Sequence, residues 1–324
     1  MPVEKPDWYC IVNPHAGSGK TMSEWAVAEK YLTASGIPYK TALTNYKFHA
    51  TLLAYEAALH GYRKILAVGG DGSVHEVLCG IMKYVDEMAE AASVPGQAGK
   101  RAEDFTLAVI PIGSGNDWIK SNGVPHDTEA VVRMISEGSF AKQDVVRVET
   151  GIGSDGVSVS YMANVGGVGF DSHVCERVNT LKERGKRSRS IYLGALLYTL
   201  FHTKSFHTRV VADGAVVYEG EIYTAAFGNG CYSGGGMRQV PQAVSDDGLL
   251  DYMIVPKASL LRILTQLPRL YNGTVNDSGL LLTGRCKCLE MSGDNIAEVD
   301  GEVKGSLPLR ITVTGQQLSI LSGR

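Results

Sequence analysis

Residues 64–77, with the sequence KILAVGGDGSVHEV, pass from a strand pattern through a glycine-rich turn into a helix pattern. The apolar run that ends at Val68 is short and bounded by glycine, which is typical of a buried strand. Ser73 is placed as an N-cap, with Glu76 three residues on as its capping-box partner. The helix that follows carries apolar residues on one face, at Val74, Val77, Leu78, Ile81 and Met82. The stretch therefore predicts a buried strand joined by a glycine turn to a helix that covers it.

The same alternation runs through the first third of the chain. Strand patterns occupy residues 8–12, 39–43, 64–68 and 105–110, and helix patterns occupy residues 21–34 and 49–59. Strands that alternate with helices favour a parallel sheet covered by helices, here a Rossmann-like α/β domain. In such sheets ligands bind beyond the carboxyl ends of the strands, and three glycine-bearing motifs fall at that edge.

From about Val145 the pattern changes to alternating apolar and polar residues. The alternation occupies residues 157–165, 208–217, 222–227 and 306–313, with Gly and Asp between the runs. A further strand pattern lies at 250–255, and helix patterns lie at about 190–203 and 258–271. This organisation favours a second, mostly antiparallel β-sandwich domain. The predicted fold class is α/β, with a parallel-sheet domain followed by a β-sandwich domain.

The composition is that of an ordinary globular protein whose 324 residues suit two domains. The 38 glycines exceed the usual share of about 7% and indicate tight turns and close approach of backbone to a ligand. A net charge of −3 argues against a general nucleic-acid binder. The six cysteines are scattered, so we expect reduced thiols in the cytosol rather than a zinc site or a disulfide framework. We expect no secretory signal, and the longest apolar run, residues 192–201, is about half of a membrane span.

Gly69 to Ser73 carry the strongest local signal for chemistry. Their three glycines remove side chains where amides must reach phosphate oxygens, and the helix start adds a favourable dipole. Asp71 is badly placed beside an anion unless a cation accompanies it, which suggests Mg²⁺ coordination or a hydroxyl that needs activation. The alternative is an ordinary strand–helix turn in which Asp71 bonds its own backbone.

Two other loops share this location. Gly113, Ser114 and Gly115 can wrap a phosphate, whereas Asn116 and Asp117 either take part or only cap the next helix. Residues 13–21, NPHAGSGKT, are not a Walker A loop because Pro14 stands where that loop needs glycine. A looser cradle, with Gly17 in the loop and Lys20 near phosphate, remains open. Three such loops at successive strand ends are hard to explain as turns alone.

In the second domain two acidic motifs stand out, in residues 245–251 (SDDGLLD) and 299–302 (VDGE). Asp-Gly is a common hairpin turn, so the residues alone favour a structural interpretation of both motifs. Asp300 and Glu302 have no obvious local partner.

Together these motifs form an ordered set that runs nearly end to end. They are Asn13-Pro14 with Gly17 to Lys20, Gly69 to Ser73 with Glu76-Val77, Pro111 with Gly113 to Asp117, Asn164 with Gly166 to Asp171, Asn229 with Gly234 to Met237 and Pro241, Asp247 to Asp251, and Asp300 to Glu302. The set resembles the diacylglycerol kinase catalytic-domain family, which includes sphingosine kinases and small bacterial lipid kinases. The likeness is greatest to the stand-alone bacterial members.

The resemblance implies that nucleotide binds in a cleft between the two domains. It places the first domain at residues 1–142, completed by about 306–324, and the lipid-substrate domain at 143–305. By similarity the residues that contact ATP are Asn13, Thr44, Gly69, Gly70, Asp71, Gly72, Ser73 and Ser114. Asp71 would serve the Mg²⁺–phosphate centre. Ser73 and Ser114 stand where the family commonly has Thr, and both keep the hydroxyl.

The resemblance also assigns roles in the second domain. Glu302 would accept the proton of the substrate hydroxyl, with Asp300 beside it, and Asp71 is the rival base. A second, structural Mg²⁺ would bind Asp247 and backbone carbonyls near Val244 and Leu249.

The predicted function is ATP- and Mg²⁺-dependent phosphorylation of a lipid hydroxyl by in-line transfer of the γ-phosphoryl group. The alternatives are an NAD kinase-like phosphotransferase and a non-catalytic nucleotide or lipid sensor. The lipid acceptor is open, and a homodimer is one candidate assembly.

We expect a cytoplasmic enzyme that is peripheral to the inner face of the membrane. The basic residues Lys182, Arg184, Lys186, Arg187 and Arg189 before the apolar segment 191–201 suit an anionic leaflet, although a solvated loop and a core helix would fit equally.

Overall fold

The computed structural model describes residues 6–91, 100–113, 115–153, 156–183 and 189–324. The chain forms two compact units. The first unit takes Met1–Val145 and Gly315–Arg324, and the second takes Val146–Thr314. The sequence placed these boundaries at 142 and 306.

The first unit is built on a parallel sheet with the strand order β2-β1-β3-β4-β17. The strands are β1 (Trp8–Val12), β2 (Tyr39–Leu43), β3 (Lys64–Gly69), β4 (Thr106–Pro111) and the last part of β17 (Leu309–Leu321). Every residue of β1 is buried, as are most residues of β3 and β4. Strands buried on both faces need helices on both faces, which explains their continuous apolar runs. The predicted parallel sheet is confirmed.

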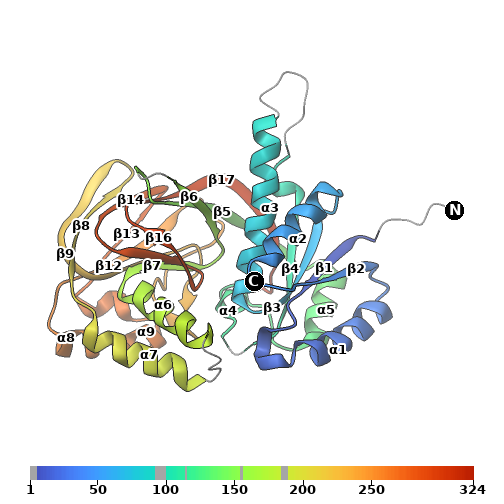
Figure 1. Ribbon diagram of the computed structural model, residues 1–324, viewed down its shortest axis with the longest axis horizontal. Helices are drawn as coiled ribbons and strands as arrows, with labels where there is room; N and C mark the ends of the chain where they lie inside the picture. The colour runs from blue at the N-terminus through green and yellow to red at the C-terminus, as the bar shows by residue number, and fades with distance from the viewer. Residues whose placement is uncertain (1–5, 92–99, 114, 154–155, 184–188) are drawn as a thin grey trace. The chain divides into compact units, whose positions relative to one another are not determined.

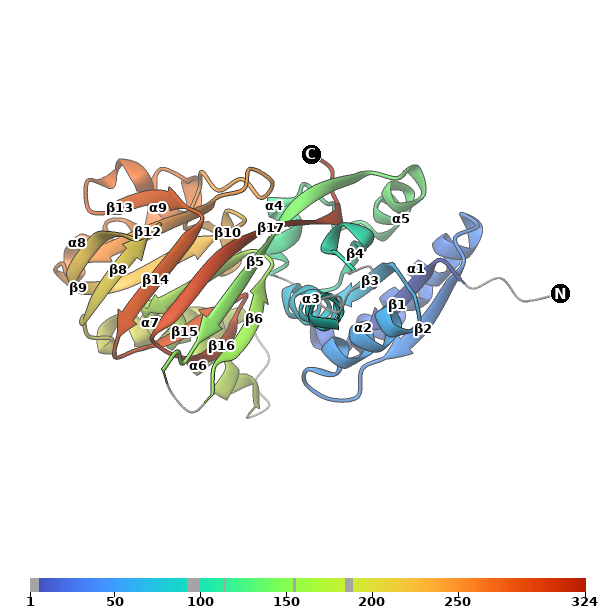
Figure 2. The same cartoon turned by 90° about the horizontal axis from the view of Figure 1, so that it is seen from above.

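Helices cover this sheet in two pairs, which Figures 1 and 2 show from two directions. The helices are α1 (Thr21–Ala34), α2 (His49–Leu59), α3 (Asp71–Ala91), α4 (Asp117–Ser121) and α5 (Thr128–Glu137), with 3-10 turns at Ala16–Gly19 and Ala102–Asp104. Helix α2 packs along α3, and α1 packs along α5.

The start of α3 differs from the prediction. The helix begins at Asp71, because the carbonyl of Gly70 already accepts the amides of Ser73 and Val74. Ser73 is therefore in the first turn and is not the N-cap. The carboxylate of Glu76 accepts the amides of Phe48 and Ala50, at 3.2 and 3.1 Å, and so stabilises the start of α2.

The second unit is a sandwich in which the long strand β9 (Ala215–Gly228) serves both sheets. Its first half pairs with β8 (Phe206–Ala212), and its second half lies between β7 (Val165–Gly169) and β12 (Leu250–Pro256). One sheet continues from β8 to β14 (Cys288–Gly293), β17, β5 (Phe140–Thr150) and β6 (Ser158–Met162). The other adds β13 (Leu282–Cys286) beside β12, and β15 (Ile296–Val299) and β16 (Glu302–Ser306) beside β7. A two-stranded ribbon joins β10 (Tyr232–Ser233) to β11 (Met237–Arg238). The strand pairs described within this unit are antiparallel, and the predicted sandwich is confirmed.

Two large apolar clusters and a small third one, at Val174, Val178 and Ala195, form the core among the described residues of the second unit. The largest cluster fills the sandwich and includes Val148, Phe227, Leu289, Val299 and Ile311. The second cluster lies around Leu200, Tyr223 and Met253, under the helices that Figure 1 draws at the lower edge of this unit. These helices are α7 (Arg189–His202), α8 (Leu260–Leu264) and α9 (Leu267–Asn272), followed by a 3-10 turn at Val275–Ser278.

Two helices in this unit differ from the prediction. The single helix expected over 258–271 is split into α8 and α9, with Pro268 near the start of α9, where proline is tolerated. Helix α6 (Phe170–Glu183) was not predicted. The four-residue spacing of Phe170, Val174 and Val178, which pack in one cluster, was the available signal.

Candidate active site

In the first unit, loops from three neighbouring strands meet at the carboxyl edge of the sheet. The loops follow β1, β3 and β4, as the sequence predicted. Asn13 of the first loop donates to the hydroxyl of Ser73 in the second, with 3.5 Å between Nδ2 and Oγ. The amide of Ile112 donates to the carbonyl of Gly69 at 2.8 Å. The parallel sheet thus brings the three motifs into direct contact.

The glycines of these loops serve different purposes. A Cβ at Gly17 would lie 2.7 Å from Cγ2 of Ile112, and one at Gly69 would lie 2.2 Å from Oγ of Ser73. Close packing within the protein is enough to require glycine at both positions. Gly72 is different, because a Cβ there would have nothing within 4 Å. Glycine inside a helix costs about 1 kcal/mol relative to alanine, and protein packing does not explain its presence at Gly72.

Asp71 joins the second loop to the third. Its Oδ2 accepts the amide of Asp117 and its Oδ1 accepts the amide of Trp118, both at 2.9 Å. These are the first amides of α4, which otherwise have no partner within the helix. The carboxylate therefore caps α4 from a position 46 residues earlier in the chain. These two bonds join Asp71 to the backbone of another loop.

The other predicted nucleotide contacts surround this edge. Thr44 is buried after β2, and its amide donates to Val12. The side chain of Lys20 is exposed at the start of α1. Asn116 is buried with a φ of 48°, and its side chain donates to the carbonyl of Gly113 at 3.2 Å, so it shapes the third loop. Gly115 lies beside the carboxylate of Asp71. Ser114 lies outside the described residues.

In the second unit, Asp300 also holds two backbone amides. Its Oδ2 accepts the amide of Ala163 at 2.7 Å and its Oδ1 accepts the amide of Asn164 at 2.8 Å. Asp300 has a φ of 52°, in the left-handed region that Asp tolerates better than most residues. The turn between β15 and β16 is thereby tied to the segment between β6 and β7.

Glu302 begins β16 immediately after this turn and is partly exposed. The turn is fixed from two sides. The amide of Gly301 donates to the buried carboxylate of Glu298 at 2.9 Å. Its carbonyl accepts from Cys175 and Asn179 of α6, at 2.9 and 3.2 Å. Glu302 therefore follows directly on a turn that three hydrogen bonds hold in place.

A buried polar network lies next to this turn. The sequence motif contained Asp171, but it assigned no role to any residue of this network. Asp171, at the start of α6, accepts from Thr224 and Gln239, each at 2.8 Å. The side chain of Gln239 in turn accepts from Ser233 at 2.7 Å. Burial raises the pKa of Asp171 to about 6, although the hydrogen bonds from Thr224 and Gln239 lower it. A carboxyl that titrates near neutral pH is a candidate for a functional role.

The residues predicted for a structural metal do not fit a divalent cation. Asp247 accepts the amide of Leu249 at 3.1 Å and forms an ion pair with Arg285, and Val244 is exposed. Over residues 6–91, 100–113, 115–153, 156–183 and 189–324, no group of three or more His, Cys, Asp or Glu could hold a metal ion.

Comparison with known proteins covers most of the chain. Residues 7–148 match the family model of the diacylglycerol kinase catalytic domain. Residues 164–322 match that of the YegS C-terminal NAD kinase beta sandwich-like domain.

Individual relatives agree with these matches. A diacylglycerol kinase of Mycobacterium tuberculosis is 26% identical over 317 residues, which is 97% of this chain and 94% of the relative. A protein of Chromohalobacter salexigens named "Probable lipid kinase YegS-like" is 30% identical over 220 residues, or 66% of this chain and 61% of that protein. A crystal structure of a diacylglycerol kinase from Bacillus anthracis has a TM-score of 0.69 at 21% identity and covers 99% of this chain and 98% of its own. That last likeness concerns the fold alone.

Proposed function

The chain belongs to the diacylglycerol kinase catalytic-domain family, and from this premise we propose that it transfers the γ-phosphoryl group of ATP to the hydroxyl of a lipid. The single observation that carries the proposal is the edge of the first unit's sheet, where three glycine loops meet and Gly72 faces open space. Backbone amides and a helix start at such an edge suit the phosphates of a nucleotide.

In this proposal the first unit holds ATP. The nucleotide residues are Asn13, Gly17, Lys20, Thr44, Gly69 to Ser73, Gly113, Gly115 and Asn116. Mg²⁺ bound with the nucleotide would neutralise phosphate charge, and Asp71 is the acidic residue of this edge that could hold it. Capping α4 is compatible with that role, since a carboxylate has about four lone-pair sites and each of the two amides takes one.

The second unit supplies the base. Glu302 accepts the proton of the lipid hydroxyl as its oxygen attacks the γ-phosphorus in line and the bond to ADP breaks. Asp300 is a positioning residue, because both of its oxygens are engaged by backbone amides. Asp71 is likewise engaged by two backbone amides, and it stays the rival base. The proposal requires both units to act on one pair of substrates, and the predicted active site between the domains stays a prediction.

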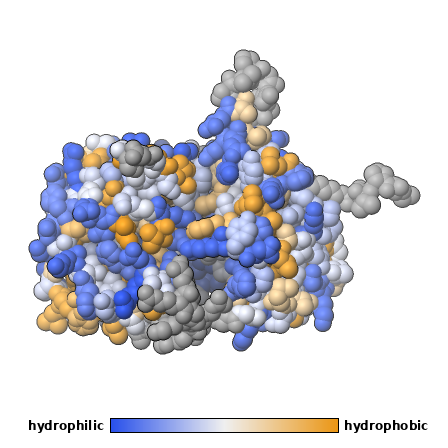
Figure 3. Space-filling view, in the orientation of Figure 1, coloured by the Kyte–Doolittle hydropathy of each residue, from blue (hydrophilic) through white to orange (hydrophobic). Residues whose placement is uncertain are grey.

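The lipid substrate requires contact with a membrane surface. Among the described helices none is long and apolar enough to span a bilayer. Helices α7 and α8 expose apolar side chains, with Leu197 at 44%, Phe201 at 64% and Leu261 at 74%. Figure 3 shows hydrophobic residues gathered at the lower left, where Figure 1 draws these helices. We propose that this face meets the inner leaflet peripherally. The basic residues at 184, 186 and 187 lie outside the described residues, and the side chains of Lys182 and Arg189 are not described.

An NAD kinase-like activity is the second candidate, because the matched C-terminal family carries NAD kinase in its description. A non-catalytic sensor is the third.

The test is transfer of phosphate from ATP with Mg²⁺ to a panel of detergent-dispersed lipid alcohols and to NAD. We expect one lipid class to be phosphorylated, with the activity lost in Glu302→Gln and kept in Glu219→Gln. Glu219 is a matched control, since it is exposed and pairs with Arg209 at 3.6 Å. Phosphorylation of NAD alone, or ATP binding without transfer to any acceptor, would overturn the proposal.

A further inference from the structure

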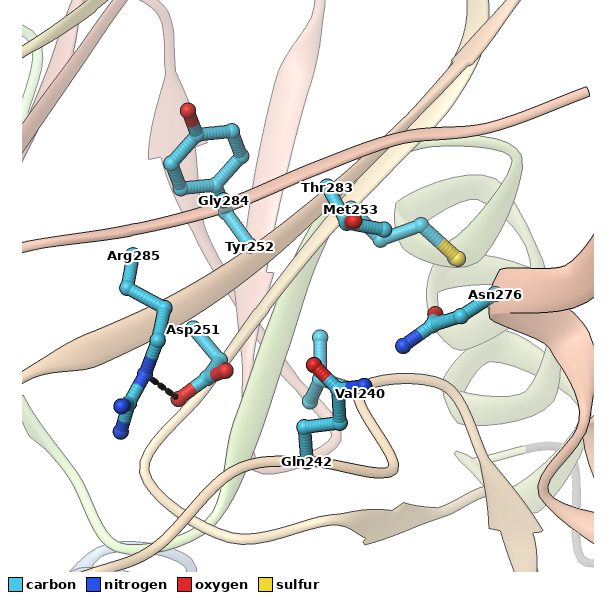
Figure 4. Close-up of a pocket in the computed structure, with 9 residues that line it drawn as sticks. All are labelled: Val240, Gln242, Asp251, Tyr252, Met253, Asn276, Thr283, Gly284 and Arg285. Carbon is cyan, nitrogen blue, oxygen red and sulfur yellow. Dashed lines mark hydrogen bonds and ion pairs between the residues drawn. The ribbon is translucent and has the colours of Figure 1, made fainter. Parts of the chain in front are cut away.

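Arg285 lies between two carboxylates at one end of the antiparallel strand pair β12–β13. It is directly opposite Asp251 in the antiparallel register of these strands. Its Nε lies 3.2 Å from Oδ2 of Asp251, a contact that Figure 4 marks with a dashed line. Its Nη2 pairs with Oδ2 of Asp247, in the loop that leads into β12. One guanidinium therefore joins two strands and a loop.

The two carboxylates differ in burial, and this makes the cation necessary. The side chain of Asp251 is 8% exposed, against 28% for Asp247 and 41% for Arg285. Burial raises the pKa of Asp251, and the charge of Arg285 opposes that rise. A buried carboxylate left without a cation is strongly destabilising. The pKa of Arg285 is raised, first by its hydrogen bond to Asp247, so the guanidinium stays charged.

Asp247 also organises its own loop. Its Oδ1 accepts the amide of Leu249, and Gly248 between them has a φ of 76°. The loop thus bends around one carboxylate oxygen of Asp247, and the other oxygen, Oδ2, pairs with Arg285. Gly284, next to Arg285, is fixed in identity, because a Cβ there would lie 2.3 Å from the hydroxyl of Tyr252. Strand β13 is therefore closely packed against Tyr252 of β12 at the residue next to Arg285.

We propose that Arg285 is the built-in cation of this loop and replaces the structural divalent metal that the resemblance placed at Asp247. Mg²⁺ requires near-octahedral oxygen ligands at 2.0–2.1 Å, whereas here the carboxylate is shared between a guanidinium and an amide. A planar guanidinium matches carboxylates at two points and cannot be removed by a chelator. The second unit is therefore stable without Mg²⁺, and any Mg²⁺ that the proposed reaction requires acts elsewhere.

The test compares thermal unfolding of the whole protein in EDTA and in millimolar MgCl₂, without nucleotide. We expect the Tm of the wild type to be the same in both, and Arg285→Ala to lower it by at least about 4 °C in either. Arg310→Ala is the matched control, because Arg310 pairs with Glu290 at an exposed site, 2.7 Å apart. That control should lower the Tm by no more than about 2 °C.

Two results would overturn the proposal. One is a wild-type Tm that rises with Mg²⁺, with the rise lost in Asp247→Asn, because the cation at Asp247 would then be a metal. The other is an equal Tm for Arg285→Ala and Arg310→Ala. If Arg285→Ala does not fold, the magnesium content of desalted wild-type protein decides, since the proposal predicts no stoichiometric Mg²⁺ in the absence of nucleotide.

Discussion

Asp71 in the first unit and Asp300 in the second make the same kind of contact. Each stands before a glycine in a motif that the family resemblance linked to catalysis, and each accepts two successive backbone amides from a distant segment. Their surroundings differ. Asp71 lies beside Gly72, whose missing side chain leaves open space, whereas Asp300 lies in a turn that α6 and Glu298 hold closed. The same contact therefore supports a ligand site in one unit and presents a neighbouring carboxylate, Glu302, in the other.

The largest expected effect separates Glu302 from Asp300. Glu302→Gln should lower kcat by about 10²–10⁴-fold, because a general base is lost. Its Tm should stay that of the wild type, since the turn is held by other residues. Steady-state kinetics and a thermal melt measure the two quantities. A variant with undiminished kcat would transfer the role of base to Asp71.

The next effect concerns stability and should appear in both units. Asp300→Ala removes two hydrogen bonds to a charged group and should lower the free energy of unfolding by about 3–5 kcal/mol in urea denaturation. Asp300→Asn keeps one acceptor oxygen and should lower the free energy of unfolding by less than Asp300→Ala does. Asp71→Ala should destabilise the first unit by a similar amount. An Asp300→Ala variant as stable as the wild type but inactive would make Asp300 a catalytic residue and end its parallel with Asp71.

A smaller effect depends on pH and belongs to Asp171. Its folded-state pKa of about 6 lies above the ordinary value of 3.8, so folding favours the protonated form. That stabilisation is present below about pH 4 and is lost as the pH rises through 6. Asp171→Asn removes the titration, so its free energy of unfolding relative to wild type should rise by up to about 3 kcal/mol from pH 4 to 7. A difference that is constant with pH would mean that Asp171 is ionised throughout.

The smallest effect tests the open space at Gly72. Gly72→Ala should raise the free energy of unfolding by about 0.5–1 kcal/mol, because alanine is the better helix former and meets no neighbour. It should weaken ATP binding at the same time, measured by calorimetry. Gly69→Ala is the contrasting variant and should destabilise, since its Cβ would collide with Ser73. Unchanged ATP binding in Gly72→Ala would show that ATP does not occupy the space beside Gly72.

The sequence predicted the parallel sheet and the sandwich because burial on both faces, or on one, leaves distinct patterns along the chain. It also placed the three loops at one edge, because the carboxyl ends of parallel strands lie at the same edge of a sheet. It did not predict that Glu76 caps α2, that Asp71 caps α4 or that Arg285 meets Asp247. Each of these partners lies 26 or more residues away along the chain, and only the fold brings them together. The polar network of Asp171 was hidden in the same way, because Thr224 and Gln239 are 53 and 68 residues away.

The most direct test of the account is transfer of labelled γ-phosphate from ATP into the lipid fraction. Wild-type protein, Glu302→Gln and Glu219→Gln would be compared with the lipid class that the panel identifies. The account predicts labelled lipid with the wild type and Glu219→Gln, and a loss of about 10²–10⁴-fold in rate with a folded Glu302→Gln. Label that appears only in NADP when NAD is supplied, or equal rates for all three proteins, would contradict it.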